Sequence, residues 1–280
     1  MQNPYTPEQI RAWAARRESS PAHLYAALDD LIKIEQCIKQ NPALIEAGDA
    51  EDATPLHYAC ATGTITMIKS LLAYGAHINS LTVHNETPLL WIMFDRNDEQ
   101  RLQKAALLLK HGADIHTQTG VGETILHHAF RMPALTKLLL AHHARTETAN
   151  IDGLTALHYS ALYDDHIKTT HLLLAAGADA NQADKDGMTP LHKAALMEGA
   201  HTIKALYDAG AILDMQDAQG YTPLHHAIMH NKYHNAKALL ELGANTALQD
   251  NNGGTPLDLA YALRAQQDII RLLEEHLSLF

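Results

Sequence analysis

GADANQADKDGMTPLHKAA, residues 177–195, joins the end of one helix to the start of the next. Thr189 can cap the second helix by accepting a backbone N–H bond, and Pro190 then occupies the first helical position, where its missing donor costs nothing. Gly177 suits the end of the preceding helix, and Gly187 suits a turn that needs positive φ. The stretch therefore predicts a helix end, a turn and a helix start in 19 residues.

Copies of this stretch recur along the chain. From the capping Thr they read TPLHYA 54–59, TPLLWI 87–92, TILHHA 124–129, TALHYS 155–160, TPLHKA 189–194, TPLHHA 222–227 and TPLDLA 255–260. The capping residues are 33, 37, 31, 34, 33 and 33 positions apart. A period of 33 with the pattern T-P-L-H-x-A resembles the ankyrin repeat family. The resemblance implies an all-α ankyrin repeat solenoid, in which β-hairpin fingers join helix-turn-helix pairs.

This spacing divides the chain into a short N-terminal part and one repeat domain. Residues 1–20 are expected to form a capping helix or an arm that engages a partner. The repeat domain spans 21–280, in units 21–53, 54–86, 87–123, 124–154, 155–188, 189–221, 222–254 and 255–280. The first unit looks degenerate, and the last resembles a C-terminal cap because one side of its final helix is polar.

Two units differ in length from the others. The segment FDRNDEQRLQK, residues 94–104, adds four residues between the helices of unit 87–123 and predicts a longer helix or a protruding loop. Unit 124–154 is two residues short, and Pro133 is expected to limit its first helix.

The composition is that of a folded, acidic protein. Apolar residues make up 46% and charged residues 19%, and the net charge is 21 − 32 = −11. An acidic surface repels phosphate backbones, so no nucleic-acid partner is expected. The 20 His residues would gain positive charge as the pH falls toward their usual pKa, which predicts sensitivity to acid.

The same sequence features bear on location. The N-terminus lacks the apolar core of a secretory signal peptide, and no stretch reaches the roughly 20 apolar residues of a membrane span. Cys37 and Cys60 form no CxxC pair, which favours a reducing compartment. We expect a monomeric, cytoplasmic protein with no membrane role. The alternative location is the cytosol of a host cell, reached without a signal peptide.

No catalytic, metal-binding or cofactor-binding residue is predicted. The sequence lacks G-x-x-x-x-G-K-[ST], G-x-S-x-G and HExxH motifs. The family resemblance implies that the motif histidines bond near the helix start and tie the fingers together; they are His57, His127, His158, His192 and His225. The spacing of His226, His230 and His234 would allow a zinc site on one continuous helix. The repeat boundary near His230 places His234 on the next helix, so a metal-dependent activity here is the less favoured alternative.

The resemblance implies that partners are held by the finger tips and by the exposed face of the first helix of each unit. Many of these positions are apolar, whereas solvated positions normally carry polar residues, which indicates an interaction surface. The alternative is that twisting between repeats buries some of them. The predicted partner-binding residues are Trp91, Phe94, Val121, Met132, Ile151, Leu154, Tyr159, Leu162, Tyr163, Met188, Leu196, Met197, Tyr221 and Met229.

Asn181 is a candidate for modification. The segment LLLAAGADAN, residues 172–181, resembles the sequences that asparagine hydroxylases accept in ankyrin repeats. The alternative is that Asn181 only shapes the turn.

These observations predict a non-catalytic scaffold or adaptor that binds a partner protein on a concave groove. The acidic balance favours a partner segment with basic residues. One alternative is a secreted bacterial effector that acts on a host protein through its repeats, because LLEEHLSLF, residues 272–280, has paired Glu residues before an apolar tail, as such effectors often do.

Overall fold

The computed structural model describes residues 6–17, 19–197 and 199–278. Over these ranges the chain forms short α-helices and 3-10 helices, with no β-strand. The all-α prediction is confirmed. No helix in the described ranges is long and apolar enough to span a membrane.

The chain divides into two compact units. Unit 1 comprises residues 1–128 and 137–144, and unit 2 comprises residues 129–136 and 145–280. The helices of unit 1 are α1 (Pro7–Arg16), α2 (Pro21–Ala27), α3 (Leu31–Gln40), η1 (Pro42–Glu46), α4 (Pro55–Thr62), α5 (Ile65–Ala73), α6 (Pro88–Trp91), η2 (Ile92–Phe94), α7 (Asp98–Lys110) and α8 (Ile125–His128).

The helices of unit 2 repeat the same pattern of an inner helix followed by an outer helix. They are η3 (Ala129–Arg131), α10 (Ala156–Ala161), η4 (Asp164–His166), α11 (Ile167–Ala175), α12 (Pro190–Leu196), α13 (Ala200–Asp208), α14 (Pro223–Met229), α15 (Tyr233–Glu241), α16 (Pro256–Ala262) and α17 (Gln267–Leu277). Helix α9 (Pro133–Ala141) contributes residues to both units.

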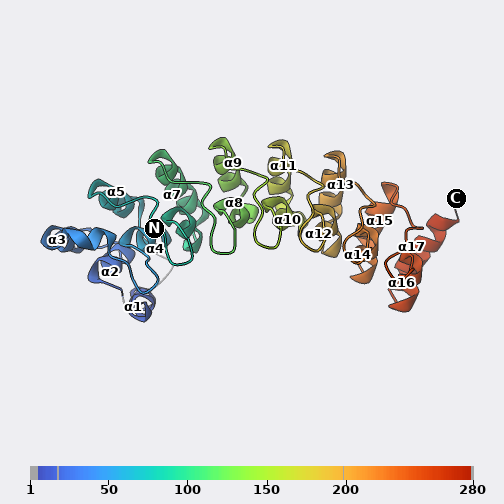
Figure 1. Ribbon diagram of the computed structural model, residues 1–280, viewed down its shortest axis with the longest axis horizontal. Helices are drawn as coiled ribbons and strands as arrows, with labels where there is room; N and C mark the ends of the chain where they lie inside the picture. Colours follow the sequence, from blue (N-terminus) through green and yellow to red (C-terminus); the bar gives the residue numbers. More distant parts are fainter. Residues whose placement is uncertain (1–5, 18, 198, 279–280) are drawn as a thin grey trace. The chain divides into compact units, whose positions relative to one another are not determined.

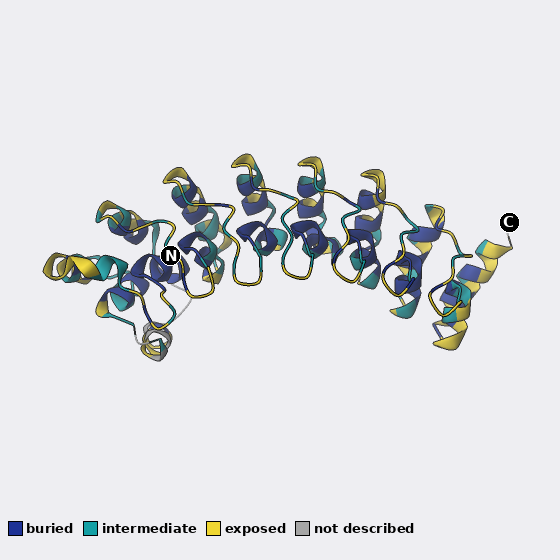
Figure 2. Cartoon of the chain, viewed as in Figure 1, coloured by how far each residue is buried: buried dark blue, intermediate teal, exposed yellow. Residues whose placement is uncertain are grey.

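Within each unit the helices pack in two rows. In unit 1, α2 packs on α4 and α4 on α6, while α5 packs on α7 (Figure 1). In unit 2, α10, α12, α14 and α16 form the inner row, and α11, α13, α15 and α17 form the outer row (Figure 1). Buried residues lie where the helices face each other, and exposed residues gather at the tips of the turns (Figure 2). Stacking of neighbouring helix pairs therefore replaces a central core.

The motif histidines fix the start of the inner helices that carry them. In unit 1 the backbone N–H of Thr54 donates to Nδ1 of His57 at 3.0 Å. Because Nδ1 accepts, the ring proton lies on Nε2, which donates to the carbonyl of Glu86 at 3.1 Å and so holds the next finger. In unit 2 the same two bonds recur: the Thr N–H donates to Nδ1 of the motif His, and Nε2 of that His donates to a carbonyl of the next finger. The Thr, His and carbonyl residues are, in order, Thr155, His158 and Met188; Thr189, His192 and Tyr221; and Thr222, His225 and Gly254. The structural role predicted for these histidines is confirmed.

The first repeat begins in the same way, which the sequence analysis missed. The backbone N–H of Ser20 donates to Nδ1 of His23 at 3.0 Å, and Nε2 of His23 donates to the carbonyl of Ala53 at 2.8 Å. Pro21 occupies the first helical position. The available signal was S-P-A-H at residues 20–23, in which Ser replaces the usual Thr.

The four-residue insertion forms a longer helix rather than a loop. Helix α7 has 13 residues and buries Lys104 completely. Nζ of Lys104 lies 2.6 Å from Oδ2 of Asp95 and donates to the carbonyl of Cys60 at 3.0 Å. Burial also raises the pKa of the Cys60 thiol to about 12, so this thiol is protonated and unreactive.

The short repeat differs from its prediction in one detail. Its first helix, α8, has only four residues, but Pro133 lies after that helix and its 3-10 extension η3. Pro133 instead stands at the first position of α9, where it needs no hydrogen-bond donor.

The fingers are tight turns rather than the β-hairpins implied by the resemblance. Among the described residues of unit 2, one backbone bond joins each finger to the one before it. These bonds run from Lys185 N–H to the carbonyl of Asp152 (2.9 Å), from Ala218 N–H to that of Asp186 (2.9 Å) and from Asn251 N–H to that of Gln219 (3.1 Å). One bond per pair gives no ladder, so no strand forms in the described residues.

Candidate partner-binding surface

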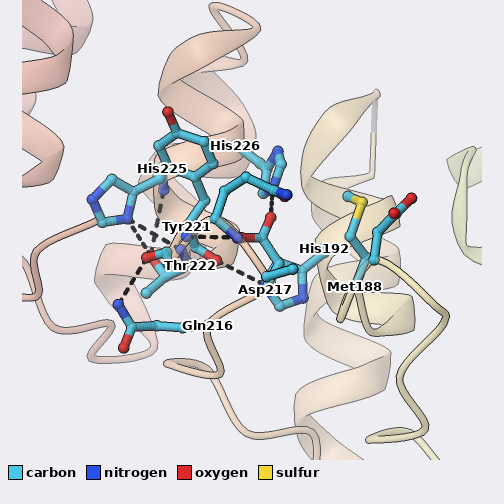
Figure 3. Close-up of polar contacts among 12 residues, drawn as sticks. Met188, His192, Gln216, Asp217, Tyr221, Thr222, His225 and His226 are labelled. Carbon is cyan, nitrogen blue, oxygen red and sulfur yellow. Dashed lines mark hydrogen bonds and ion pairs between the residues drawn. The ribbon is translucent and has the colours of Figure 1, made fainter. Parts of the chain in front are cut away.

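An aspartate at the start of a finger ties that finger to the inner helix that follows it. Oδ1 of Asp217 accepts the backbone N–H groups of Gln219 and Tyr221, both at 2.9 Å. Oδ2 of the same carboxylate lies 2.7 Å from Nε2 of His226 (Figure 3). Burial lowers the pKa of His226, against the opposing effect of Asp217. The finger and the helix are therefore locked together by one side chain.

Related contacts occupy the same helix position in other repeats. Asp184 pairs with Lys193 at 2.7 Å, and Tyr58 donates to Asp49 at 2.7 Å. Each partner follows its aspartate by nine residues. Helix residues four positions after the capping residue are thus held by the protein itself, and they contribute less to an open surface than the sequence analysis expected.

Trp91 was predicted to lie open to a partner, and this prediction is wrong. Its side chain is 1% exposed. Nε1 donates to Oε2 of Glu86 at 2.8 Å, the Tyr58 ring lies 5.6 Å away, and the Arg17 guanidinium lies 5.2 Å from the centre of the indole ring. Arg17 comes from the N-terminal segment, whose contribution to burial the repeat pattern did not include.

Met132 is the second incorrect member of the predicted set, because it is 7% exposed. Its backbone N–H donates to the carbonyl of Ala129 at 2.8 Å and closes the 3-10 turn η3. The shortened repeat therefore places Met132 at the junction between two helices instead of on an open helix face.

The remaining predicted residues are exposed or half-buried. Tyr159 is half-buried, stacks on Phe130 and accepts a hydrogen bond from Asn150. Exposed side chains in unit 1 are Phe94 (49%) and Val121 (48%), and those in unit 2 are Ile151 (52%), Tyr163 (38%) and Met197 (38%). The other half-buried residues, all in unit 2, are Leu154, Leu162, Met188, Leu196, Tyr221 and Met229.

One part of this set forms a regular feature of unit 2, which we call the apolar stripe. It consists of residues at the C-terminal ends of three successive inner helices, α10, α12 and α14. The fingers of the first two of these repeats carry the exposed carboxylates of Asp152 and Asp186. The stripe is therefore a row of apolar side chains in repeats that carry acidic finger tips. Its members are Leu162, Tyr163, Leu196, Met197 and Met229.

The histidine cluster considered for zinc does not assemble. Helix α14 ends at Met229 and α15 begins at Tyr233, so His234 lies on a different helix from His226. Nε2 of His226 is already paired with Asp217. No group of three metal-binding side chains occurs in the part of the chain that the structure describes.

Comparison with protein families agrees with this architecture. A model of ankyrin repeats, three copies, matches residues 13–118, 93–184 and 160–250. The chain belongs to the ankyrin repeat family. Ankyrin repeats indicate a role in protein–protein interaction.

Two relatives from Arabidopsis thaliana share part of this ankyrin sequence. A serine/threonine-protein kinase, VIK, is 30% identical over 96 residues, which is 34% of this chain and 21% of the kinase. An ADP-ribosylation factor GTPase-activating protein, AGD2, is 35% identical over 81 residues, which is 29% of this chain and 10% of that protein. This chain thus spans about a fifth of the length of the kinase and about a tenth of the length of the GTPase-activating protein.

Asn181 bridges two ankyrin repeats of unit 2. Its Nδ2 donates to the carbonyl of Gly210 at 2.9 Å, and its Oδ1 accepts the backbone N–H of Ile212 at 2.8 Å. Both ends of the amide therefore support the neighbouring turn, which favours a structural role.

Hydroxylation of Asn181 stays a prediction that mass can test. If a hydroxylase modifies the side chain, protein produced in eukaryotic cells should carry one added oxygen, and Asn181→Ala should abolish the increase. An unmodified intact mass, or an increase that persists in Asn181→Ala, would contradict it.

Proposed function

We propose that this ankyrin repeat protein is a non-catalytic adaptor that binds a partner protein through the apolar stripe of unit 2. The supporting observation is the exposure of Tyr163 and Met197, each 38%, at corresponding positions of consecutive repeats. Exposed aromatic and Met side chains in a row are typical of binding surfaces, because they lose more water-exposed apolar area on binding than polar residues do.

The charges around the stripe favour a particular kind of partner. Asp152 and Asp186 are exposed on fingers of the same repeats, and the whole chain carries a net charge of −11. A partner segment that combines apolar side chains with Lys or Arg would complement both features. The repeats are already folded, so binding would order few residues of this protein.

The packing of the C-terminal helix supports a capping role for residues 255–280 over a secretion signal. Leu273 of α17 is fully buried, and Tyr261 of α16 donates to Glu274 of α17. The paired Glu residues that suggested an effector tail thus belong to a packed helix. We place the adaptor in the cytoplasm, as a monomer.

A pair of matched variants tests the proposed surface. The double variant Tyr163→Ser, Met197→Ser should lose proteins that the intact protein captures from cell extract, because it removes exposed apolar contacts of the stripe. The control is Tyr207→Ser, Ile212→Ser, which removes similarly exposed apolar residues, 40% and 55%, from outer helix α13 and the turn that follows it.

Both variants must first melt within about 2 °C of the intact protein, as expected for exposed positions. Loss of captured proteins in the control alone, or in neither variant, would contradict the proposed surface.

A further inference from the structure

A second recognition feature lies between the fingers of unit 1. Here backbone bonds align each finger with the one before it: Ala50 N–H donates to Arg17 at 2.8 Å, Val83 N–H to Glu51 at 2.9 Å, and Gly120 N–H to His84 at 2.7 Å. Arg17, Glu51 and His84 therefore occupy equivalent positions of successive fingers. The spaces between these fingers are equivalent as well.

The guanidinium group of Arg17 lies beside the finger of residues 49–53. Nε of Arg17 lies 3.3 Å from Oδ2 of Asp49, and Nη2 pairs with Glu51. The same guanidinium lies over the ring of Trp91. Two carboxylates and an aromatic face are a strong environment for arginine, which is planar, permanently charged and rich in donors. Unit 1 thus shows how finger carboxylates and an aromatic ring together bind arginine.

The space between the fingers of residues 82–86 and 119–123 is an open cleft of about 410 Å³. Its two carboxylates, Glu86 and Glu123, come from adjacent fingers, and exposed Val121 offers an apolar wall. No Arg or Lys is among the described residues that line it, which are His84, Glu86, Thr119, Gly120, Val121, Glu123 and His128.

The carboxylates of the cleft are held in place by neighbouring side chains. Oε2 of Glu86 accepts the indole N–H of Trp91 at 2.8 Å, whereas its Oε1 accepts no hydrogen bond from the described residues. Oε2 of Glu123 lies 3.1 Å from Nε2 of His128. An incoming guanidinium would therefore meet positioned negative charge, and its aliphatic stem could lie along Val121.

We infer that the cleft between residues 82–86 and 119–123 binds an arginine side chain of a partner protein. Arg17 shows that finger carboxylates and an aromatic ring of unit 1 bind a guanidinium group, and the cleft combines two carboxylates with an apolar wall. This goes beyond the proposed stripe, because the cleft lies in unit 1 and the stripe in unit 2.

The experiment uses the full-length protein and a fluorescein-labelled peptide of alternating arginine and glycine. Fluorescence anisotropy should show binding of this peptide and little binding of the same peptide with citrulline, a neutral analogue of arginine. The double variant Glu86→Gln, Glu123→Gln should weaken binding by about tenfold or more. The amide introduced by Glu86→Gln keeps an oxygen for the Trp91 N–H, so the fold should persist.

A control variant separates the cleft from general attraction to an acidic protein. Asp208→Asn, Glu241→Gln removes the same two charges from exposed positions of unit 2, where each carboxylate pairs with a Lys. Its affinity should stay within about twofold of the intact protein. Equal weakening in both double variants, binding of the citrulline peptide, or no binding of the arginine peptide would overturn the inference.

A second variant tests the cleft without removing its carboxylates. Val121→Arg would place a guanidinium beside the cleft and should block the peptide, whereas Ile151→Arg adds the same charge at a finger of unit 2 and should not. Equal affinity of these two variants would also overturn the inference. The Tyr163→Ser, Met197→Ser variant should still bind the peptide, so failure of the cleft and failure of the stripe give different results.

Discussion

Lys104→Met is expected to lower the free energy of unfolding by about 3–5 kcal/mol, because it leaves a carboxylate buried without its counter-ion. Lys104 is 0% exposed and Asp95 is 1% exposed. The ammonium group lies 2.6 Å from that carboxylate and also satisfies the carbonyl of Cys60 near the end of α4. The inserted residues of α7 are therefore joined to the preceding repeat through one buried charge.

Urea unfolding followed by circular dichroism measures this effect. The control is Lys110→Met, at the exposed end of the same helix, which should change stability by no more than about 0.5 kcal/mol. Adding Asp95→Asn to Lys104→Met should recover part of the loss, since the neutral amide leaves no buried charge. Equal stabilities for the Lys104 and Lys110 variants would show that the buried pair contributes nothing.

Acidification from pH 6.5 toward pH 4 is expected to cost about 1.4 kcal/mol per pH unit for each of three buried motif histidines. Burial lowers the pKa of His57, His158 and His192 to about 4. In the unfolded chain these rings titrate near their usual pKa of 6.5, so the unfolded state binds protons first. Their contribution to stability is complete above pH 6.5 and is lost as the pH falls toward 4.

Unfolding free energies at pH 7 and pH 5 test this dependence, and His192→Gln tests its source. Gln can donate to the carbonyl of Tyr221 but cannot gain a proton, so the variant should lose one histidine's share of the pH dependence. His142→Gln, at an exposed position outside the T-P-L-H motif, is the control and should keep the contribution of all three motif histidines. A stability that is the same at both pH values would contradict the assignment of neutral, buried histidines.

The repeat architecture was predictable because its signals are local. The Thr, Pro and His of T-P-L-H lie within four residues. The bond from the Thr backbone N–H to the His ring forms in every complete copy of the motif. The start at Ser20 was less evident in the sequence because Ser stands where the other copies have Thr, although Ser caps helices equally well. Helix boundaries and finger positions thus followed from short-range chemistry.

The surface was less predictable because exposure depends on distant residues. Trp91 occupies a helix position that the register marks as open, yet Arg17, Glu86 and Tyr58 cover it. The nine-residue spacing between Asp217 and His226 was visible in the sequence, but nothing there showed that the two side chains meet. Tyr163 and Met197 are exposed, as the register predicted, although the edge of the Tyr163 ring contacts His166.

Site-specific photo-crosslinking tests the proposed adaptor function most directly. A photoreactive phenylalanine analogue at position 163, in the apolar stripe, should form a covalent adduct with a partner protein in cell extract. The same analogue at position 207, exposed on the outer row of the same unit, should form none. An adduct at position 207 alone, or none at position 163, would contradict binding through the stripe.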